Sequence, residues 1–197
     1  IIKPARIFEP CVVDGRVWCV PVNVHSWQWG WASIPVFEQS GVEIPTTLNQ
    51  FLEQAPQIQE AGFIPFAIGG ESWQHAGALQ VVLLSQLGSE GYYRLYRDRD
   101  TDYAKGPEVA AALELWRGLT SYIDEGSANR NWNDTTNLII TDRAALQIMG
   151  DWARGEFALA GEVPGEDYAC LPGGPSEHPY LDTGGDIFVF PKQDDPE

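Results

Sequence analysis

The sequence predicts one α/β domain, with a small open sheet flanked by helices. Its 197 residues are enough to bury a sizeable core. Apolar residues make up 44% of the chain and charged residues 20%, which is typical of a globular protein rather than a disordered one. Short runs rich in β-branched residues alternate with longer segments whose apolar residues recur at helical spacing. This alternation indicates the α/β class.

The chain is expected to open with two extended segments. Residues 16–24 form an apolar, β-branched run, and Pro21 within it predicts a strand that bends or lies at a sheet edge. Residues 25–32 continue as a second extended segment, rich in aromatic side chains. A short helix over residues 35–39 follows, and Gly41 ends it.

Two longer helices and a strand are expected next. The first helix begins after Thr47, whose hydroxyl suits an N-cap, and ends at Gly62. The apolar run 63–68 predicts a short buried strand. The second helix covers residues 72–87, with Gly88 directly behind it.

The second half continues the alternation. Pro107 suits the first turn of a helix. The expected buried face of that helix consists of Val109, Leu113, Trp116, Leu119 and Tyr122. The remaining expected elements are a helix over 134–140, a strand over 145–149, a helix over 152–159, a Gly/Pro-rich loop around 168–170 and a strand over 186–190.

The charge of the chain excludes some partners. Acidic residues number 28 and Lys plus Arg 12, which gives a formal net charge of −16. Nucleic acids and anionic membranes are held by clustered cations, so no nucleic acid partner is expected. Between Arg16 and Arg94 there is neither Lys nor Arg, which argues against a phosphate-binding surface in the first half.

Cysteine and aromatic usage narrow the function further. The three cysteines leave at most one disulfide and contain no CxxC pair, so neither a zinc site nor any cofactor is predicted. The chain has eight Trp, of which four lie close together: Trp18, Trp27, Trp29 and Trp31. Such a cluster is typical of a core, or of a stacking platform for a ring-shaped ligand.

Candidate ligand-binding residues lie at predicted strand ends. Gly150, Asp151 and Trp152 follow one strand, and Asp186 begins the last. An indole face packs on the C–H face of a sugar, and a carboxylate accepts hydrogen bonds from two adjacent hydroxyls. With His25 as a third polar contact, these residues suit a neutral polyhydroxylated ligand. Asp151 and Asp186 also leave open a glycoside hydrolase or lyase that uses paired carboxylates.

Several segments, in the right order, resemble a known family. They are Gly15–His25 (a GK-hydrophobic-PVNVH strand), Val36–Gly41 with Ile44–Thr47, Ile68–Gly70 with Trp73–Gln74, Ala145–Ala153 (an AAM-GDWA element), Gly165–Gly173 and Gly185–Lys192. Together they resemble the C-terminal lobe of the extracellular sugar-binding proteins of bacterial ABC importers, and most closely those of the glucose-binding type. The resemblance covers nearly the whole chain.

The resemblance implies a fold and a domain division. Proteins of this family have a type II periplasmic-binding-protein-like fold, in which two α/β lobes are joined by crossover strands and hold the sugar between them. This chain is then expected to contain one lobe, in a mature or excised piece of the protein. Residues 1–14 would be a remnant of the first lobe and crossover, residues 15–192 the C-terminal ligand-binding lobe, and residues 193–197 the start of the return.

The resemblance also assigns the site. Trp152 would stack on the sugar, Asp186 would bind its hydroxyls, and His25 would lie on the cleft floor with Trp29 beside it. Asp151 and Gly185 complete the expected ligand-binding set. The family usually has Arg after the His, where this chain has Ser26.

The position of Cys19 is normally apolar in the family, so the resemblance gives no reason to assume a disulfide there. A Cys11–Cys170 disulfide stays open, although the spacing does not support it.

The implied function is capture of a mono- or oligosaccharide for an ABC transporter permease, without catalysis. The resemblance implies a periplasmic or otherwise extracytoplasmic location, either free or attached to the membrane by a lipoprotein anchor. The other expected partner is the missing first lobe of the same protein. Two alternatives stay open: the hydrolase or lyase, and a polysaccharide-binding interaction module that uses the Trp cluster.

Overall fold

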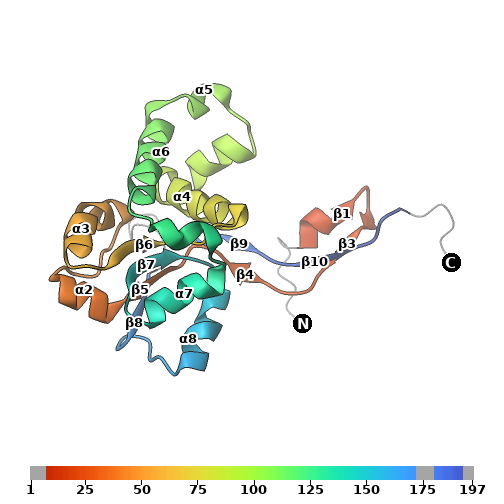
Figure 1. The fold of residues 1–197 in the computed structure, drawn as a ribbon. Coiled ribbons are helices and arrows are strands. Elements are labelled where there is room, and N and C mark those ends of the chain that lie inside the picture. The colour runs from red at the N-terminus through yellow and green to blue at the C-terminus, as the bar shows by residue number, and fades with distance from the viewer. Residues whose placement is uncertain (1–7, 172–179, 193–197) are drawn as a thin grey trace.

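A computed structural model describes residues 8–171 and 180–192. Figure 1 shows a body of helices packed around a central sheet, and a thin ribbon of paired strands that leaves the body on one side. The mixed α/β architecture confirms the expected fold class.

The body is built on a four-stranded mixed sheet with the order β6-β7-β5-β8. Its strands are β5 (Gly30–Ser33), β6 (Ile64–Ala67), β7 (Ala144–Ile148) and β8 (Tyr168–Leu171). β6 and β7 are parallel, whereas β5 pairs antiparallel with both β7 and β8. Every residue of β5 and β7 is buried, as expected for central strands covered on both faces.

Helices and short 3-10 turns make up the rest of the body. They are α2 (Ile34–Ser40), α3 (Leu48–Glu60), α4 (Ser72–Tyr96), α5 (Thr101–Ala104), α6 (Pro107–Thr120), η2 (Glu125–Asn129), α7 (Trp132–Ile140), η3 (Asp151–Ala153) and α8 (Arg154–Ala160). The 3-10 turn η1 (Glu9–Cys11) lies outside the body, on the ribbon (Figure 1). None of the helices in the described ranges is both long and apolar enough to cross a membrane.

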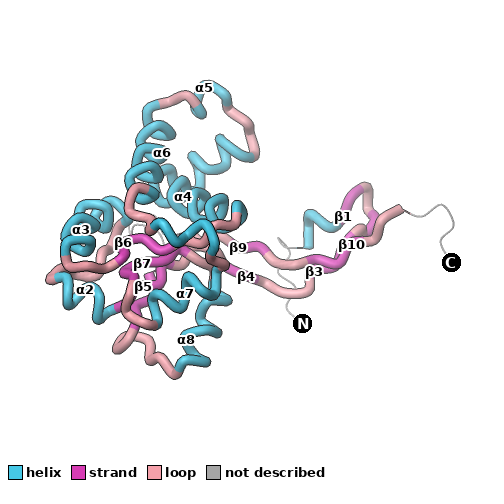
Figure 2. The backbone as a smooth tube through the Cα atoms, viewed as in Figure 1, coloured by secondary structure: helices cyan, strands magenta, loops and turns pink. Residues whose placement is uncertain are grey.

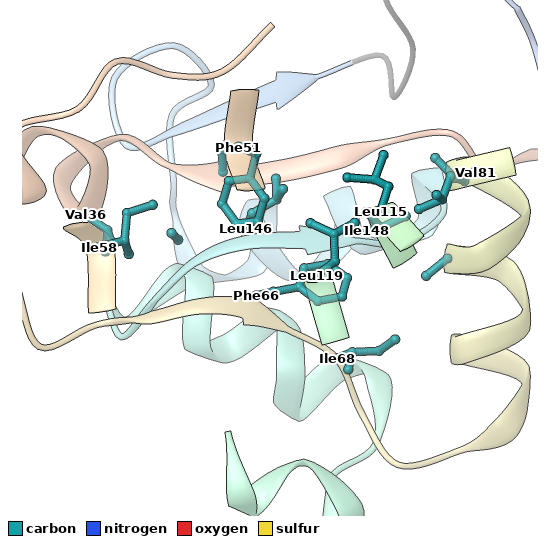
Figure 3. Close-up of a cluster of buried hydrophobic side chains, with 14 of the residues drawn as sticks. Val36, Phe51, Ile58, Phe66, Ile68, Val81, Leu115, Leu119, Leu146 and Ile148 are labelled. Carbon is teal, nitrogen blue, oxygen red and sulfur yellow. The ribbon is translucent and has the colours of Figure 1, made fainter. Parts of the chain in front are cut away.

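Two hydrophobic clusters pack against the sheet. Ala32 and Phe66 belong to the larger one, with side chains from α2, α3, α4 and α6 (Figure 3). Trp31 and Ala67, their neighbours on the same strands, belong to the second, with side chains from α7 and α8. Because successive side chains of a strand point to opposite faces, the two clusters cover the two faces of the sheet.

Local signals in the sequence fix several helix ends. The hydroxyl of Ser33 accepts a hydrogen bond from the Val36 N–H at 3.2 Å, and that of Thr47 accepts one from the Gln50 N–H at 3.1 Å. Gly41 ends α2 in the left-handed conformation, with φ of 68°. The expected helices at 35–39 and after Thr47 are therefore confirmed. Helix α4 is longer than expected because it continues beyond a kink at Gly88, where φ is 64° and ψ is 179°.

The ribbon joins segments far apart in the chain. β3 (Cys19–Pro21) pairs antiparallel with β10 (Ile187–Val189), and β4 (His25–Ser26) pairs with β9 (Thr183–Gly184). Figure 2 shows these two pairs following one another as the ribbon leaves the body. The ribbon carries many exposed apolar side chains, namely those of Val12, Val13, Val17, Val20, Val22, Val24, Ile187, Phe188, Val189 and Phe190.

The structure contains a disulfide that was not expected from the sequence. Cys11 is bonded to Cys19, with Cα atoms 4.8 Å apart, and Cys170 is free. The cause is the hairpin of β1 (Val12–Val13) and β2 (Arg16–Val17). It turns at Asp14 and Gly15, which both have positive φ, and so returns the chain to Cys11.

Three expected elements also need correction. The single strand over 16–24 is broken into β2 and β3, because different partner strands cover its two parts. Residues 168–170 belong to β8, which pairs with β5, and do not form a loop. In α6, Leu113 is 46% exposed and Ala112 and Leu115 are buried in its place.

Candidate functional site

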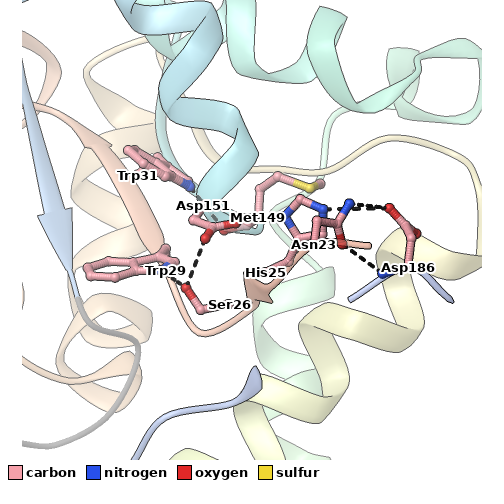
Figure 4. Close-up of polar contacts among 8 residues, drawn as sticks. All are labelled: Asn23, His25, Ser26, Trp29, Trp31, Met149, Asp151 and Asp186. Carbon is pink, nitrogen blue, oxygen red and sulfur yellow. Dashed lines mark hydrogen bonds and ion pairs between the residues drawn. The ribbon is translucent and has the colours of Figure 1, made fainter. Parts of the chain in front are cut away.

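Polar side chains from three separate segments meet where the ribbon joins the body (Figure 4). Asn23, His25 and Ser26 come from β4 and the residues before it. Asp151 begins η3, shortly after the end of β7, and Asp186 precedes β10. The fold thus brings residues more than a hundred positions apart into one hydrogen-bonded network.

His25 lies between two carboxylates. Its Nδ1 is 3.3 Å from Asp151 Oδ1, and its Nε2 is 3.8 Å from Asp186 Oδ2. The His25 side chain is 31% exposed, while those of Asp151 and Asp186 are 41% and 76% exposed. Both carboxylates can therefore still accept hydrogen bonds from a bound molecule.

Asp151 is oriented by a neighbour on β4. The Ser26 hydroxyl donates to Asp151 Oδ2 at 3.3 Å and accepts a hydrogen bond from Trp29 Nε1 at 2.7 Å. Trp29 thus reaches the site through Ser26, while its ring lies 6.4 Å from that of Trp31 in the second cluster.

Asp186 is held by Asn23. The Asn23 Nδ2 donates to Asp186 Oδ2 at 2.6 Å, and the Asp186 N–H donates to Asn23 Oδ1 at 2.7 Å. A Cβ at Gly185 would lie 2.2 Å from the carbonyl oxygen of Asn23, so a side chain there would force these segments apart. Gly185 is thus required by the close approach of the two backbones.

Aromatic rings adjoin the polar network at His25. The ring of Trp152 lies 5.1 Å from that of His25, at an interplanar angle of 83°. Trp27 lies 4.9 Å from Trp152, and Trp73 lies 5.8 Å from Trp27, both in edge-to-face contacts. A Cβ at Gly150 would lie 2.2 Å from the Trp152 ring, so the ring packs closely against the backbone of Gly150, two residues before it.

A further carboxylate, that of Asp182, belongs to the segment that is hydrogen-bonded to Trp27. The Asp182 carbonyl accepts the Trp27 N–H at 3.0 Å, and its carboxylate accepts Gln80 Nε2 at 2.9 Å. Burial raises the pKa of Asp182 above its ordinary value, and the hydrogen bond from Gln80 partly opposes this effect.

The structure brings the expected site residues together. His25, Asp151, Trp152, Gly185 and Asp186 all lie in or against one network, and Trp29 joins it through Ser26. Among the described residues, no group of three His, Cys, Asp or Glu side chains could hold a metal ion.

Sequence reasoning missed four contributors: Asn23, Ser26, Trp27 and Trp73. Asn23 and Trp27 stand two residues before and two after His25. Alternation along an extended segment points such residues to the same side, so this spacing was a usable signal. The position of Trp73 depends on where α4 packs, which no local pattern contains.

Comparison with known proteins gives a family and a common fold. The family model of the bacterial extracellular solute-binding proteins matches residues 3–197. The chain is 35% identical over 170 residues to a probable sugar-binding periplasmic protein of Rhizobium meliloti, covering 86% of this chain and 41% of that protein. A protein of the same description from Mesorhizobium japonicum is 35% identical over 167 residues, covering 85% and 40%. The chain thus spans about two fifths of the length of these relatives.

Solved structures share the fold. A manno-oligosaccharide-specific solute-binding protein of Bifidobacterium animalis, in complex with mannotriose, superposes with a TM-score of 0.71 and 18% identity, over 93% of this chain and 46% of that one. A protein from a study of xylan utilisation by Caldanaerobius polysaccharolyticus gives a TM-score of 0.73 and 17% identity, over 95% of this chain and 50% of that one.

Proposed function

Because the chain belongs to the family of bacterial extracellular solute-binding proteins, we propose that its network around His25 binds a neutral sugar for an ABC transporter. The family consists of solute-binding proteins, which are not enzymes, and its members are extracellular. The location of the chain is therefore extracytoplasmic. Asp151 and Asp186 are accordingly hydrogen-bonding groups and not the catalytic pair of a hydrolase or lyase.

One observation carries the proposal. A partly exposed indole, that of Trp152, stands beside two carboxylates that are oriented by other side chains and still open to solvent. The indole face covers the apolar face of a sugar ring, while Asp186 and Asp151 accept hydrogen bonds from its hydroxyls. His25 lies between the two carboxylates and offers a further polar contact. Their negative charge disfavours anionic sugars.

We also propose that these residues form one side of the site and that a second lobe forms the other. The chain spans 41% of the length of its Rhizobium relative, and the ribbon exposes apolar side chains, Phe188 at 68% and Val189 at 64%, that suit burial against further protein. Ligand bridging both lobes would favour a closed form, which is the form that docks on the permease. The 197 residues alone should then bind sugar weakly, because half the contacts are missing.

Calorimetric titration of the protein expressed from its complete gene tests the proposal. A panel of neutral mono- and disaccharides should include at least one that binds, and Trp152→Ala should weaken that binding at least tenfold, about 1.4 kcal/mol. Tyr93→Ala, which removes an exposed aromatic ring from α4 outside the network, serves as the control. Failure of every small sugar, with binding of a polysaccharide that persists in Trp152→Ala, would favour the interaction module.

A further inference from the structure

Two tryptophans that follow Trp152 in a series of ring contacts, Trp27 and Trp73, indicate how large the ligand is. This inference rests on the proposed function. Trp152, Trp27 and Trp73 form a row that begins at the polar network, with ring centroids 4.9 Å and then 5.8 Å apart. Trp152 and Trp27 are partly exposed, and Trp73 is 38% exposed. The row therefore presents indole surface to solvent over three neighbouring rings.

The Trp27 ring packs against helix α4 at a glycine, Gly77. A Cβ at Gly77 would lie 2.2 Å from the Trp27 ring, so the ring rests directly on the helix backbone. Glycine in a helix interior costs about 1 kcal/mol relative to alanine. Gly77 therefore weakens helix α4, but it leaves room for the Trp27 ring, which a larger residue would displace. A role of the Trp27 ring in sugar binding would account for a glycine at this position despite the loss of helix stability.

The polar groups are distributed unevenly along the row. His25, Asp151 and Asp186 gather at the Trp152 end. Near Trp27, the Asp182 carboxylate is already hydrogen-bonded to Gln80 and partly buried. A single sugar ring that stacks on Trp152 and bonds to the network would leave Trp27 and Trp73 uncovered.

We propose that the site takes a neutral sugar of at least two rings. The first ring stacks on Trp152 and bonds to Asp151 and Asp186. The second ring packs in the corner between the nearly perpendicular indoles of Trp27 and Trp73, whose planes meet at 73°. Most of its contacts there are apolar, so this second position favours ring stacking over a particular arrangement of hydroxyls.

Calorimetric titration of the complete protein with matched sugars tests this inference. The pairs are glucose with cellobiose and with maltose, mannose with mannobiose, and xylose with xylobiose. In at least one pair the disaccharide should bind at least tenfold more tightly than its monosaccharide. Trp73→Ala should lower that ratio about tenfold, and Trp73→Phe should lower it less because a ring remains. Tyr93→Ala, another exposed aromatic residue on α4, is the control.

The outcomes separate the two proposals. A monosaccharide that binds as tightly as every disaccharide containing it, or a ratio that Trp73→Ala leaves unchanged, overturns the two-ring site. If Trp152→Ala still abolishes binding in that case, the proposed function stands. Absence of binding by every sugar in the panel overturns both.

Discussion

Asn23 and Asp186 are 163 residues apart and form two hydrogen bonds with each other, at 2.6 Å and 2.7 Å. One bond joins the two side chains, and the other fixes the Asp186 backbone to the same amide. Asp186 lies 76% exposed, where a carboxylate would otherwise rotate freely. Asn23 therefore orients Asp186, which is the more exposed of the two carboxylates beside His25.

The first prediction is that Asn23 acts on sugar binding through Asp186. Asn23→Ala should weaken binding by about threefold to tenfold, since a hydrogen bond contributes about 1 kcal/mol. In an Asp186→Asn background the same change should have much less effect. Calorimetry on the four proteins of this double-mutant cycle measures the coupling. An equal loss in both backgrounds would show that Asn23 acts independently of Asp186.

The second prediction concerns the seat of Trp27. Gly77→Ala should lower the melting temperature and weaken sugar binding, because the new Cβ would lie 2.2 Å from the ring and overpacking costs about 1–3 kcal/mol. The matched control is Gly155→Ala in α8, where a Cβ would meet nothing within 4 Å. That change should stabilise the protein by up to about 1 kcal/mol. Equal melting temperatures for the two variants would contradict the role given to Gly77.

The third prediction is a stability that depends on pH through Asp124. The Arg130 side chain donates to Asp124 Oδ1 at 2.9 Å and holds the pKa of that carboxyl below its ordinary value. A lowered pKa means that the stabilisation is present above pH 4 and is lost as the pH falls through the folded-state value. Asp124→Asn should therefore cost about 2 kcal/mol at pH 7 and progressively less below pH 4. Denaturant unfolding across this range measures it, and a cost independent of pH would contradict it.

The fourth prediction concerns the cysteines. Without reductant, iodoacetamide should label only Cys170, and mass spectrometry should find Cys11 and Cys19 linked. Burial raises the pKa of the Cys170 thiol, so its labelling should be slow at pH 7 and quicken as the pH rises. Labelling of Cys11 or Cys19 in the unreduced protein would contradict the pairing.

Elements with local signals were predictable from the sequence. Helix α3 was expected because Thr47 caps it and its apolar residues repeat at helical spacing. The prediction of a single strand over 16–24 was wrong. A strand extends only as far as its partner, and residues 187–189 pair only with Cys19–Pro21. β8 was not predicted, because residues 168–171 form a strand by pairing with β5, and on their own they are typical of a loop. Local pattern contains no information about such partners.

The same distinction holds for the site. His25, Asp151 and Asp186 were expected because each follows or precedes a recognisable strand, and the structure joins all three. Trp73 was not expected, because it contacts Trp27 only through the packing of α4, with Gly77 under the Trp27 ring. The Cys11–Cys19 pair was missed because it depends on the turn at Asp14 and Gly15.

A crystal structure of the complete protein with a bound sugar would locate the ligand directly. We expect a sugar ring stacked on Trp152, with hydroxyls hydrogen-bonded to Asp186 and Asp151. A sugar bound elsewhere, with no contact to Trp152 or to either carboxylate, would contradict this expectation.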